Sequence, residues 1–288
     1  MNRENVLLAG ATGYLGSYIL SELLNRQYEV RVVVRSPGKI DPGEADKIEV
    51  IDAQVTEAES IRDCCEGIDV VISTVGITRQ KDGLKYMDVD YQANKNFLDD
   101  ALKHGVKKFI YVSVFLGREL LDIKVVEAKE RFVDELKESA MDYCIIRPNG
   151  FFSDMEEIYK MAQNGRVYLI GDGEYKLNPI HGKDLAPVCV DAIGKTKKEI
   201  EVGGPEIFSQ NEIASIAFDV VGKEKKISHF PEWTGKLILF LIRLFTTQKT
   251  YGPVEFFLKV MLRDIVAPKT GEHTLREFYT RLKENNPP

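Results

Sequence analysis

The stretch Val6–Leu20, VLLAGATGYLGSYIL, decides the fold of this chain of 288 residues. A short apolar run enters three glycines, Gly10, Gly13 and Gly16, and continues directly into a segment whose apolar residues have helical spacing. Glycines permit a tight turn and let the backbone approach a pyrophosphate, and the N-terminus of a helix attracts phosphate through its N–H groups. The stretch therefore predicts a strand, a phosphate-binding turn and a helix, although a plain strand-to-helix turn is the alternative.

Short apolar runs alternate with amphipathic segments through the first half of the chain, and this alternation predicts a parallel sheet covered on both faces. The rhythm breaks after Pro148, where short strands, glycine-rich turns and further helices follow. Capping boxes predict helices that begin after Thr56, Ser209 and Thr274. We therefore expect a Rossmann-type doubly wound parallel sheet in residues 1–150 and a smaller C-terminal α/β lobe for substrate or partner in residues 151–288, with segments that interleave. The predicted strands of the first half are 5–9, 30–34, 48–51, 70–73, 109–113 and 143–146, and the predicted helices are 14–25, 58–65, 87–103 and 121–139.

Composition excludes several classes of protein. The net charge is −6, and this disfavours a nucleic acid partner because phosphate neutralisation dominates that affinity. The four cysteines form no CxxC pair and have no histidine at metal spacing, so we expect no metal site and a reducing, cytoplasmic location. The apolar run within residues 235–246 is too short to span a membrane. We interpret it as a buried helix or as a contact with a second copy or a protein partner, in preference to a membrane-surface helix.

The residues after the second predicted strand indicate which dinucleotide binds. Enzymes that use NAD place an acidic residue there for the ribose hydroxyls, whereas this chain has Arg35, followed by Lys39, with no acid before Asp41. An arginine pairs with a 2′-phosphate that an acid would repel. The sequence therefore favours NADP(H) over NAD(H), and the alternative is that Arg35 is a solvated charge at a strand end.

The chain resembles the atypical and extended short-chain dehydrogenase/reductase superfamily, with closest likeness to its NmrA-like and divinyl-reductase-like branches. The motifs that carry the resemblance are GATGYLG from Gly10, VVVRSP from Val32, DYQANKN from Asp90, IYVSV around Ser113, IIRPNGFF from Ile145, GDGEYKLNPIHGKDLA from Gly171 and HTLREFY ending at Tyr279. The resemblance covers nearly the whole chain. It implies that the cofactor is bound by Gly10, Thr12, Gly13, Tyr14, Leu15, Gly16, Arg35, Lys39, Asp52, Ala53, Thr74, Val75, Gly76, Lys129, Pro148 and Asn149.

The catalytic motif of that superfamily, Tyr-x-x-x-Lys, is incomplete here because Val125 replaces the tyrosine. Lys129 remains, in the middle of an apolar helical stripe, where an ammonium group is costly unless it is paired. We predict that Lys129 contacts the cofactor and less strongly that it donates a proton with a lowered pKa, and the alternative is that it reaches past the stripe to solvent. Ser113 is the second catalytic candidate, and Tyr86 and Tyr91 are weaker substitutes for the missing phenol.

Three residues of the second half are predicted to face the substrate: Phe151, Phe152 and His181. The phenylalanines are equally compatible with a core role, and a histidine at a helix start more often has a structural one. We also expect the polar loop 78–85 to border the nicotinamide or to be a surface loop. The leading hypothesis is an NADPH-dependent reductase of a small carbonyl or activated alkene. The alternatives are a catalytically silent NADP(H)-binding sensor or accessory subunit and, less favoured, a sugar-nucleotide epimerase.

Overall fold

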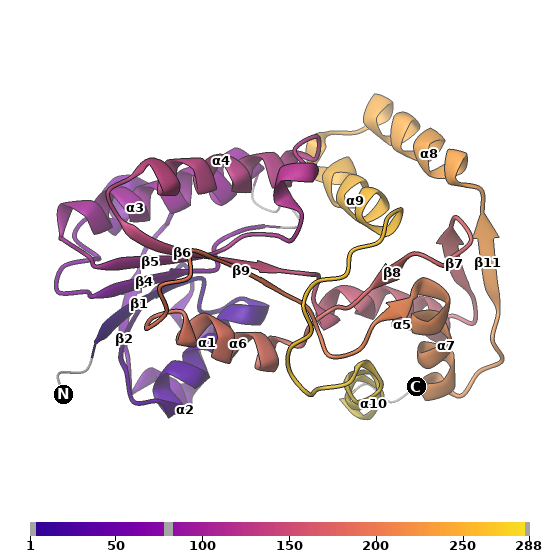
Figure 1. Cartoon of the computed structure of the whole chain (residues 1–288), viewed down its shortest axis with the longest axis horizontal. Coiled ribbons are helices and arrows are strands. Elements are labelled where there is room, and N and C mark those ends of the chain that lie inside the picture. The colour runs from indigo at the N-terminus through magenta and orange to yellow at the C-terminus, as the bar shows by residue number, and fades with distance from the viewer. Residues whose placement is uncertain (1–3, 78–82, 286–288) are drawn as a thin grey trace. The chain divides into compact units, whose positions relative to one another are not determined.

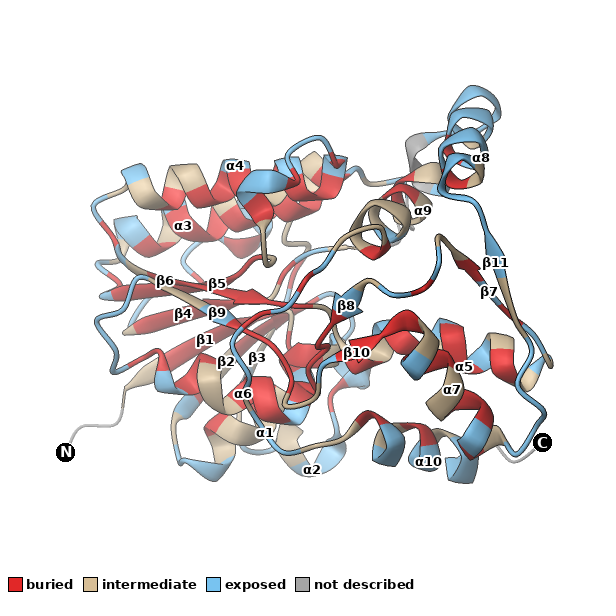
Figure 2. Cartoon of the chain, turned by 45° about the vertical axis from the view of Figure 1, so that its right-hand side comes forward, coloured by how far each residue is buried: buried red, intermediate tan, exposed pale blue. Residues whose placement is uncertain are grey.

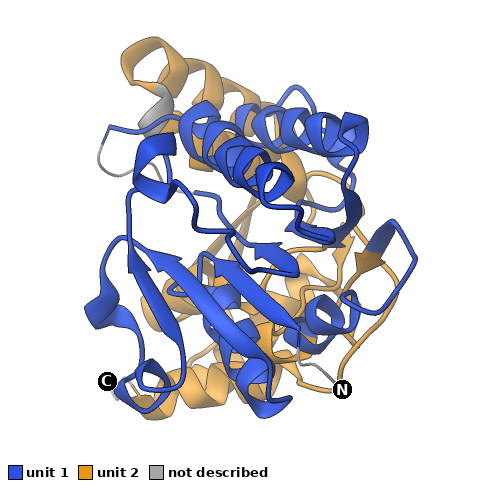
Figure 3. Cartoon of the chain, turned by 90° about the vertical axis from the view of Figure 1, so that its left-hand side faces the viewer, with its two compact units in different colours: residues 1–147, 185–200 blue, residues 148–184, 201–288 orange. Residues whose placement is uncertain are grey.

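The computed structural model describes residues 4–77 and 83–285, and the chain divides into two compact units. The first unit contains residues up to Arg147 together with Leu185–Ile200, and the second contains Pro148–Asp184 and the residues from Glu201 onward (Figure 3). The chain thus passes from the first unit to the second, returns, and passes over again. Each unit is described by itself below.

A seven-stranded sheet forms the centre of the first unit, in the order β3-β2-β1-β4-β5-β6-β9 (Figure 1). The pairs from β3 to β6 are all parallel, which confirms the predicted Rossmann-type sheet. The strands are β1 Asn5–Ala9, β2 Glu29–Val34, β3 Glu49–Asp52, β4 Val70–Ser73, β5 Lys108–Val112, β6 Asp142–Pro148 and β9 Glu199–Val202.

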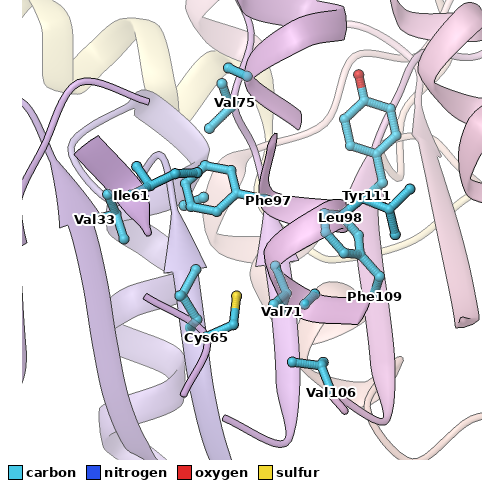
Figure 4. Close-up of a cluster of buried hydrophobic side chains, with 14 of the residues drawn as sticks. Val33, Ile61, Cys65, Val71, Val75, Phe97, Leu98, Val106, Phe109 and Tyr111 are labelled. Carbon is cyan, nitrogen blue, oxygen red and sulfur yellow. The ribbon is translucent and has the colours of Figure 1, made fainter. Parts of the chain in front are cut away.

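Helices cover both faces of this sheet, with α3 and α4 on one face and α1 on the other (Figure 1). The helices are α1 Tyr14–Asn25, α2 Pro42–Ala45, α3 Asn94–Lys103, α4 Lys124–Glu138 and α6 Gly182–Asp191, with short turns η1 Pro37–Lys39, η2 Ala58–Ile61, η3 Met87–Ala93 and η4 Gly117–Glu119. A hydrophobic core lies between the sheet and the pair α3 and α4. Figure 4 shows Phe97 and Leu98 of α3 beside Val71 of β4 and Phe109 of β5.

Two predicted helices differ from the structure. The segment expected to be helical over 58–65 forms only the 3₁₀ turn η2, and the predicted cap at Thr56 is absent because Glu57 precedes the turn and caps nothing with its side chain. The helix cannot continue because Asp63 has a left-handed φ of 62°, and the Asp100 carboxylate accepts the N–H groups of Asp63 and Cys65. The helix expected from Met87 begins as the π-helical segment η3 and becomes α-helical only at Asn94.

The second unit is built on helices with two small sheets. Its parts are η5 Phe152–Met155, α5 Glu156–Gln163, β7 Val167–Ile170, β8 Lys176–Leu177, β10 Phe208–Ser209, α7 Gln210–Val221, β11 Ile227–Phe230, α8 Glu232–Phe245, α9 Gln248–Met261 and α10 Leu275–Asn285. The predicted capping box of Ser209 with Glu212 opens α7, and Thr274 and Glu277 exchange the same two hydrogen bonds at the start of α10. Helix α7 packs against α5 and α10, and α8 packs against α9.

Candidate functional site

The strand order of the sheet reverses between β1 and β4, and the glycine-rich turn follows β1 at this point. In open α/β sheets, ligands bind outside the carboxyl ends of the strands where the order reverses. The two strand ends are close together, because a Cβ on Gly10 would lie 2.5 Å from the Thr74 hydroxyl oxygen at the end of β4. The Thr74 hydroxyl donates to the carbonyl oxygens of Ala9 and Gly10 and so joins the two ends.

The turn from Gly10 to Gly16 brings the start of α1 close against the end of β1. Gly10 has a φ of +88°, and a Cβ on Gly16 would lie 2.0 Å from the Gly10 carbonyl oxygen, so only glycine allows α1 to begin so close to β1. No side chain caps α1 at Gly13, and its first turn contains no acidic residue. Thr12 and Gly13 at the start of α1 are exposed, whereas Leu15 and Gly16 are buried. The N-terminus of the helix is therefore accessible to an anion.

The ends of β2 and β3 carry the residues expected at the adenosine half of the cofactor. Arg35 directly follows β2, and Lys39 ends the turn η1; both side chains are exposed. Asp52 is the exposed last residue of β3. Ala53 is buried and donates its N–H to the Val34 carbonyl oxygen, so the backbone after β3 is fixed to β2. The strand-end placement expected of these four residues is therefore present.

Lys129 is held at the carboxyl end of β4 by a buried carboxylate. Its Nζ lies 3.1 Å from Asp90 Oδ1, and the side chains of Lys129 and Asp90 are 18% and 0% exposed. A Cβ on Gly76 would lie 2.7 Å from the same Nζ and 2.6 Å from the same carboxylate oxygen. The missing side chain at Gly76, next to the buried Val75, therefore leaves the space in which the ion pair forms.

Tyr111 of β5 adds a phenol to this pair. Lys129 Nζ lies 5.6 Å from the centre of the Tyr111 ring, and Figure 4 shows the Tyr111 hydroxyl pointing away from Phe109. Among the described residues, the buried Tyr111 hydroxyl has no hydrogen-bond partner, and the buried Asp90 Oδ1 has only its ion pair with Lys129 Nζ. Buried polar atoms without partners are rare, and they are typical of sites that a ligand completes. Sequence reasoning missed Tyr111 because a tyrosine within an apolar strand has the pattern of a core residue.

The pKa values of these groups follow from burial and charge. Burial raises the pKa of Asp90 and the pKa of Tyr111. Burial alone would lower the pKa of Lys129, but attraction to the Tyr111 and Asp90 oxygens outweighs burial, and the pKa of Lys129 is raised above its ordinary value. The prediction of a lowered lysine pKa is therefore wrong. At neutral pH, Lys129 is an ammonium ion.

Ser113 is engaged in the interior of the first unit. Its hydroxyl donates to Glu130 Oε1 over 2.9 Å, and the same carboxylate receives two hydrogen bonds from the Arg147 guanidinium, at 2.6 and 3.1 Å. Glu130 is fully buried and Arg147 is 5% exposed. Arg147 also pairs with Glu199 at 2.7 Å. Because the Ser113 hydroxyl donates its hydrogen bond to Glu130, it does not donate to a substrate in this structure.

The remaining predicted residues belong to the second unit. Pro148 ends β6, and Asn149, 2% exposed, donates to Asn178 Oδ1 over 2.6 Å and to the Ile265 carbonyl oxygen. Phe151 is half-buried and forms a bridge with Ile180, and Phe152 is buried. The Phe152 ring lies 5.6 Å from the His181 ring, and the His181 ring is stacked on His273 at 4.8 Å. Of the loop 78–85, residues 78–82 lie outside the described residues.

His181 makes the stability of the chain sensitive to acid. Burial, with a smaller contribution from the nearby His273, lowers the pKa of His181 to about 4 from an ordinary 6.5. The unfolded chain therefore takes up a proton that the folded chain excludes, and the free energy of unfolding should fall as pH drops from about 6.5. The loss from this residue should reach about 3 kcal/mol at pH 4.

The Lys183 N–H donates to His181 Nδ1, and an asparagine side chain can accept the same hydrogen bond. We therefore expect His181→Asn to remove the loss of unfolding free energy at low pH that comes from His181. Urea unfolding of both proteins at pH 7 and pH 4 measures it. Parallel pH dependences in the two proteins would show that His181 is not the group responsible.

Known proteins with similar sequences include reductases and an assembly factor. The divinyl chlorophyllide a 8-vinyl-reductase of Arabidopsis thaliana is 27% identical over 96% of this chain and 76% of that protein. The photosystem II assembly factor Ycf39 of Synechocystis sp. is 25% identical over 86% of this chain and 76% of that protein. These relatives confirm the predicted resemblance to the divinyl-reductase-like branch.

Solved structures share the fold. A nucleoside-diphosphate-sugar epimerase from Staphylococcus aureus matches with a TM-score of 0.75 at 17% identity, covering 96% of this chain and 99% of that one. An NADPH-dependent quinone oxidoreductase from Escherichia coli, complexed with NADPH, matches with a TM-score of 0.72 at 17% identity and the same coverage. At this identity the likeness establishes the fold alone. Within residues 4–77 and 83–285, no helix combines the length and the apolar content needed to cross a membrane.

A family model described as NAD(P)H-binding matches residues 10–196. The match begins at Gly10, the residue that follows β1, and includes the ends of β2, β3 and β4 together with Asp90, Tyr111 and Lys129. The geometry of the turn and the extent of the match agree: the chain belongs to the NAD(P)H-binding family.

Proposed function

We propose that the chain is an NADPH-dependent reductase of an activated alkene or a small carbonyl compound. The observation that carries the proposal is the ammonium group of Lys129, fixed by Asp90 at the carboxyl end of β4, in the same unit as the glycine turn. The 8-vinyl-reductase relative, which aligns with 96% of this chain, supports an alkene as the substrate class. The cytoplasmic location and the small-molecule substrate stay predictions.

The residues that would hold NADPH are those at the strand ends. The backbone from Gly10 to Gly16 would bind the pyrophosphate, Arg35 and Lys39 the 2′-phosphate, and Lys129 the hydroxyls of the nicotinamide ribose. When bound, NADPH supplies a hydride to the substrate carbon and leaves as NADP⁺. A proton must then reach the second atom of the reduced double bond.

Lys129 is better suited to charge stabilisation than to proton donation. A group whose pKa is raised is a weak acid near neutral pH, whereas a fixed ammonium stabilises the negative charge that develops on an activated substrate. The Ser113 hydroxyl donates to Glu130, so we assign the proton to water. Val125 replaces the tyrosine of the Tyr-x-x-x-Lys motif, and a mechanism in which water supplies the proton does not require a phenol in contact with the substrate.

Turnover tests the proposal. The protein is incubated with NADPH and a panel of vinyl-substituted arenes, enones, quinones and aldehydes, and NADPH absorbance is followed. Oxidation with at least one class, faster for alkenes than for aldehydes, is the expected result. Binding of NADPH without oxidation by any compound would favour a silent cofactor-binding subunit instead. Two observations support that second candidate: Val125, and the Ycf39 relative named as an assembly factor.

Arg35→Ala is expected to weaken NADPH binding about 10- to 100-fold, because hydrogen bonds to a charged group contribute about 1.5–3 kcal/mol. NADH lacks the 2′-phosphate and should bind to the variant as it does to the original chain. Fluorescence titration of the two cofactors measures both affinities. Equal losses for NADH and NADPH would contradict the assignment of Arg35 to the 2′-phosphate.

Gly16→Ala is expected to lower affinity for both cofactors. Its Cβ would meet the Gly10 carbonyl oxygen, and overpacking of this kind costs about 1–3 kcal/mol, or about 5- to 150-fold in affinity. Gly194→Ala is the matched control, because a Cβ there meets nothing within 4 Å. The same titrations apply, and unchanged affinity in Gly16→Ala would place the pyrophosphate elsewhere.

A further inference from the structure

Helix α8 exposes large apolar side chains along its whole length. Seven of them are 42% to 78% exposed, with Phe245, Leu244, Phe240 and Trp233 all above 60%; the other three are Leu237, Ile238 and Leu241. We call these seven residues the apolar arc. Figure 2 shows α8 almost entirely in the colour of exposed residues. Such a concentration is unusual on a protein surface and marks a contact with another phase or molecule.

The opposite side of α8 is packed within the second unit. Gly235 and Leu239 are buried, and a Cβ on Gly235 would lie 3.1 Å from the Ile170 side chain of β7 and 3.9 Å from the Leu258 side chain of α9. At about 100° per residue, the apolar arc spans about 160° of the helix circumference, and Gly235 and Leu239 lie outside it. Helix α8 is thus packed within the second unit through its Gly235 and Leu239 side, and the apolar arc takes no part in that packing.

Positive charge lies beside the arc. Lys236 and Arg243 occupy the strip between the packed side and the arc, at about 280–300° when Trp233 is set to zero, and Glu232 is the one acidic residue in the same strip of α8, at about 260°. Arg243 is anchored, because its guanidinium pairs with the buried Glu255 of α9, which Lys259 also approaches within 3.3 Å. Residues 231–262 contain four basic and two acidic residues, whereas the rest of the chain contains 35 basic and 43 acidic residues. This segment is therefore basic in an acidic protein.

We propose that the apolar arc of α8 inserts into the surface of a membrane that contains anionic lipid. A wide arc of Trp, Phe, Leu and Ile flanked by Lys and Arg is the pattern of a helix that lies in the membrane interface. The local positive charge is complementary to anionic headgroups, while the acidic remainder of the chain is repelled. A protein–protein interface has an apolar centre and a polar rim, so binding of a second copy or a protein partner is the outcome that the test below must distinguish from membrane binding. The exposure of the arc contradicts the expectation that residues 235–246 form a buried helix, and the contact with a second copy or a protein partner stays a prediction.

The single tryptophan of the chain, Trp233, lies in the arc and reports on the test directly. The protein is titrated with vesicles of phosphatidylcholine alone and of phosphatidylcholine and phosphatidylglycerol in equal parts, and Trp fluorescence and vesicle flotation are measured. We expect a blue shift and flotation with the anionic vesicles, reversed by high salt. Brominated acyl chains should quench the fluorescence.

Two variants locate the contact. Phe240→Ser with Leu244→Ser should lower partitioning into anionic vesicles at least tenfold. Leu102→Ser with Leu121→Ser, at leucines of the first unit that are 42% and 44% exposed, should leave it unchanged. NADPH affinity, measured in parallel, should be the same in all three proteins and serves as the folding control. Three results would each overturn the proposal. The first is no blue shift with either vesicle, and the second is partitioning of the first variant equal to that of the original protein. The third is a concentration-dependent dimer that the first variant abolishes, without any vesicle binding.

Discussion

Lys129→Met is expected to lower the rate of NADPH oxidation about 10²- to 10³-fold, the loss that follows removal of one preorganised donor from a developing charge. Methionine keeps the length and the apolar stem of lysine but has no ammonium group. Because Lys129 is also assigned to the nicotinamide ribose, NADPH affinity should fall as well, by a smaller factor. Stopped-flow oxidation and fluorescence titration measure the two effects separately.

Lys129→Met also leaves the Asp90 carboxylate buried without its counter-ion, which lowers the free energy of unfolding, so the control variant must remove that effect. Lys129→Met with Asp90→Asn removes both charges, so the free energy of unfolding should recover while turnover stays low. Lys124 lies on the same helix and its side chain is 54% exposed, so Lys124→Met should change neither the free energy of unfolding nor turnover. If the double variant regained turnover, the single variant would have acted through stability, and Lys129 would have no direct role in catalysis.

Arg147→Met is expected to lower the free energy of unfolding by about 3 kcal/mol, the lower end of the cost of breaking a buried pair, because the buried Glu130 carboxylate keeps only the Ser113 hydrogen bond and the half-exposed Arg118, whose Nε lies 3.1 Å from Glu130 Oε2. Burial alone would lower the pKa of Arg147, but Glu130 and Glu199 outweigh it and raise that pKa, which is the sign of a pair stabilised by its charges. Urea denaturation measures the loss.

Removing both partners should restore much of the stability. Glu130→Leu with Arg147→Met replaces the ion pair by apolar side chains, and such replacements are often neutral. Arg62→Ala, which breaks the exposed pair with Glu59, should leave the free energy of unfolding unchanged. If Arg147→Met behaved like Arg62→Ala, the buried network around Ser113 would not be a stabilising element of the first unit.

The features predicted well from sequence are those fixed by local chemistry. The turn at Gly10, Gly13 and Gly16 needs glycine because the backbones of β1 and α1 nearly touch, and a short run of residues contains that requirement. The capping boxes at Ser209 and Thr274 are local for the same reason, because four consecutive residues supply both hydrogen bonds. The position of Lys129 on the inward side of its helix follows from the 3.6-residue period.

The features that were missed depend on residues far apart in the chain. Asp90 and Tyr111 meet Lys129 only when η3, β5 and α4 pack together, so no spacing in the sequence connects them. The raised pKa of Lys129 could not be predicted for the same reason. Glu130 and Arg147 are 17 residues apart and look like ordinary surface charges in the sequence. The predicted helix over 58–65 failed because Asp100, from another element, binds the backbone at Asp63 and Cys65.

Transfer of isotope from cofactor to product tests the central claim most directly. The protein is incubated with NADPH that carries deuterium at both hydrogen positions of nicotinamide C4 and with an activated alkene, and the product is analysed by mass spectrometry. The account predicts one deuterium per reduced molecule, with the second hydrogen taken from solvent water. NADPH that binds at the glycine turn but leaves no deuterium in any alkene or carbonyl product would contradict it.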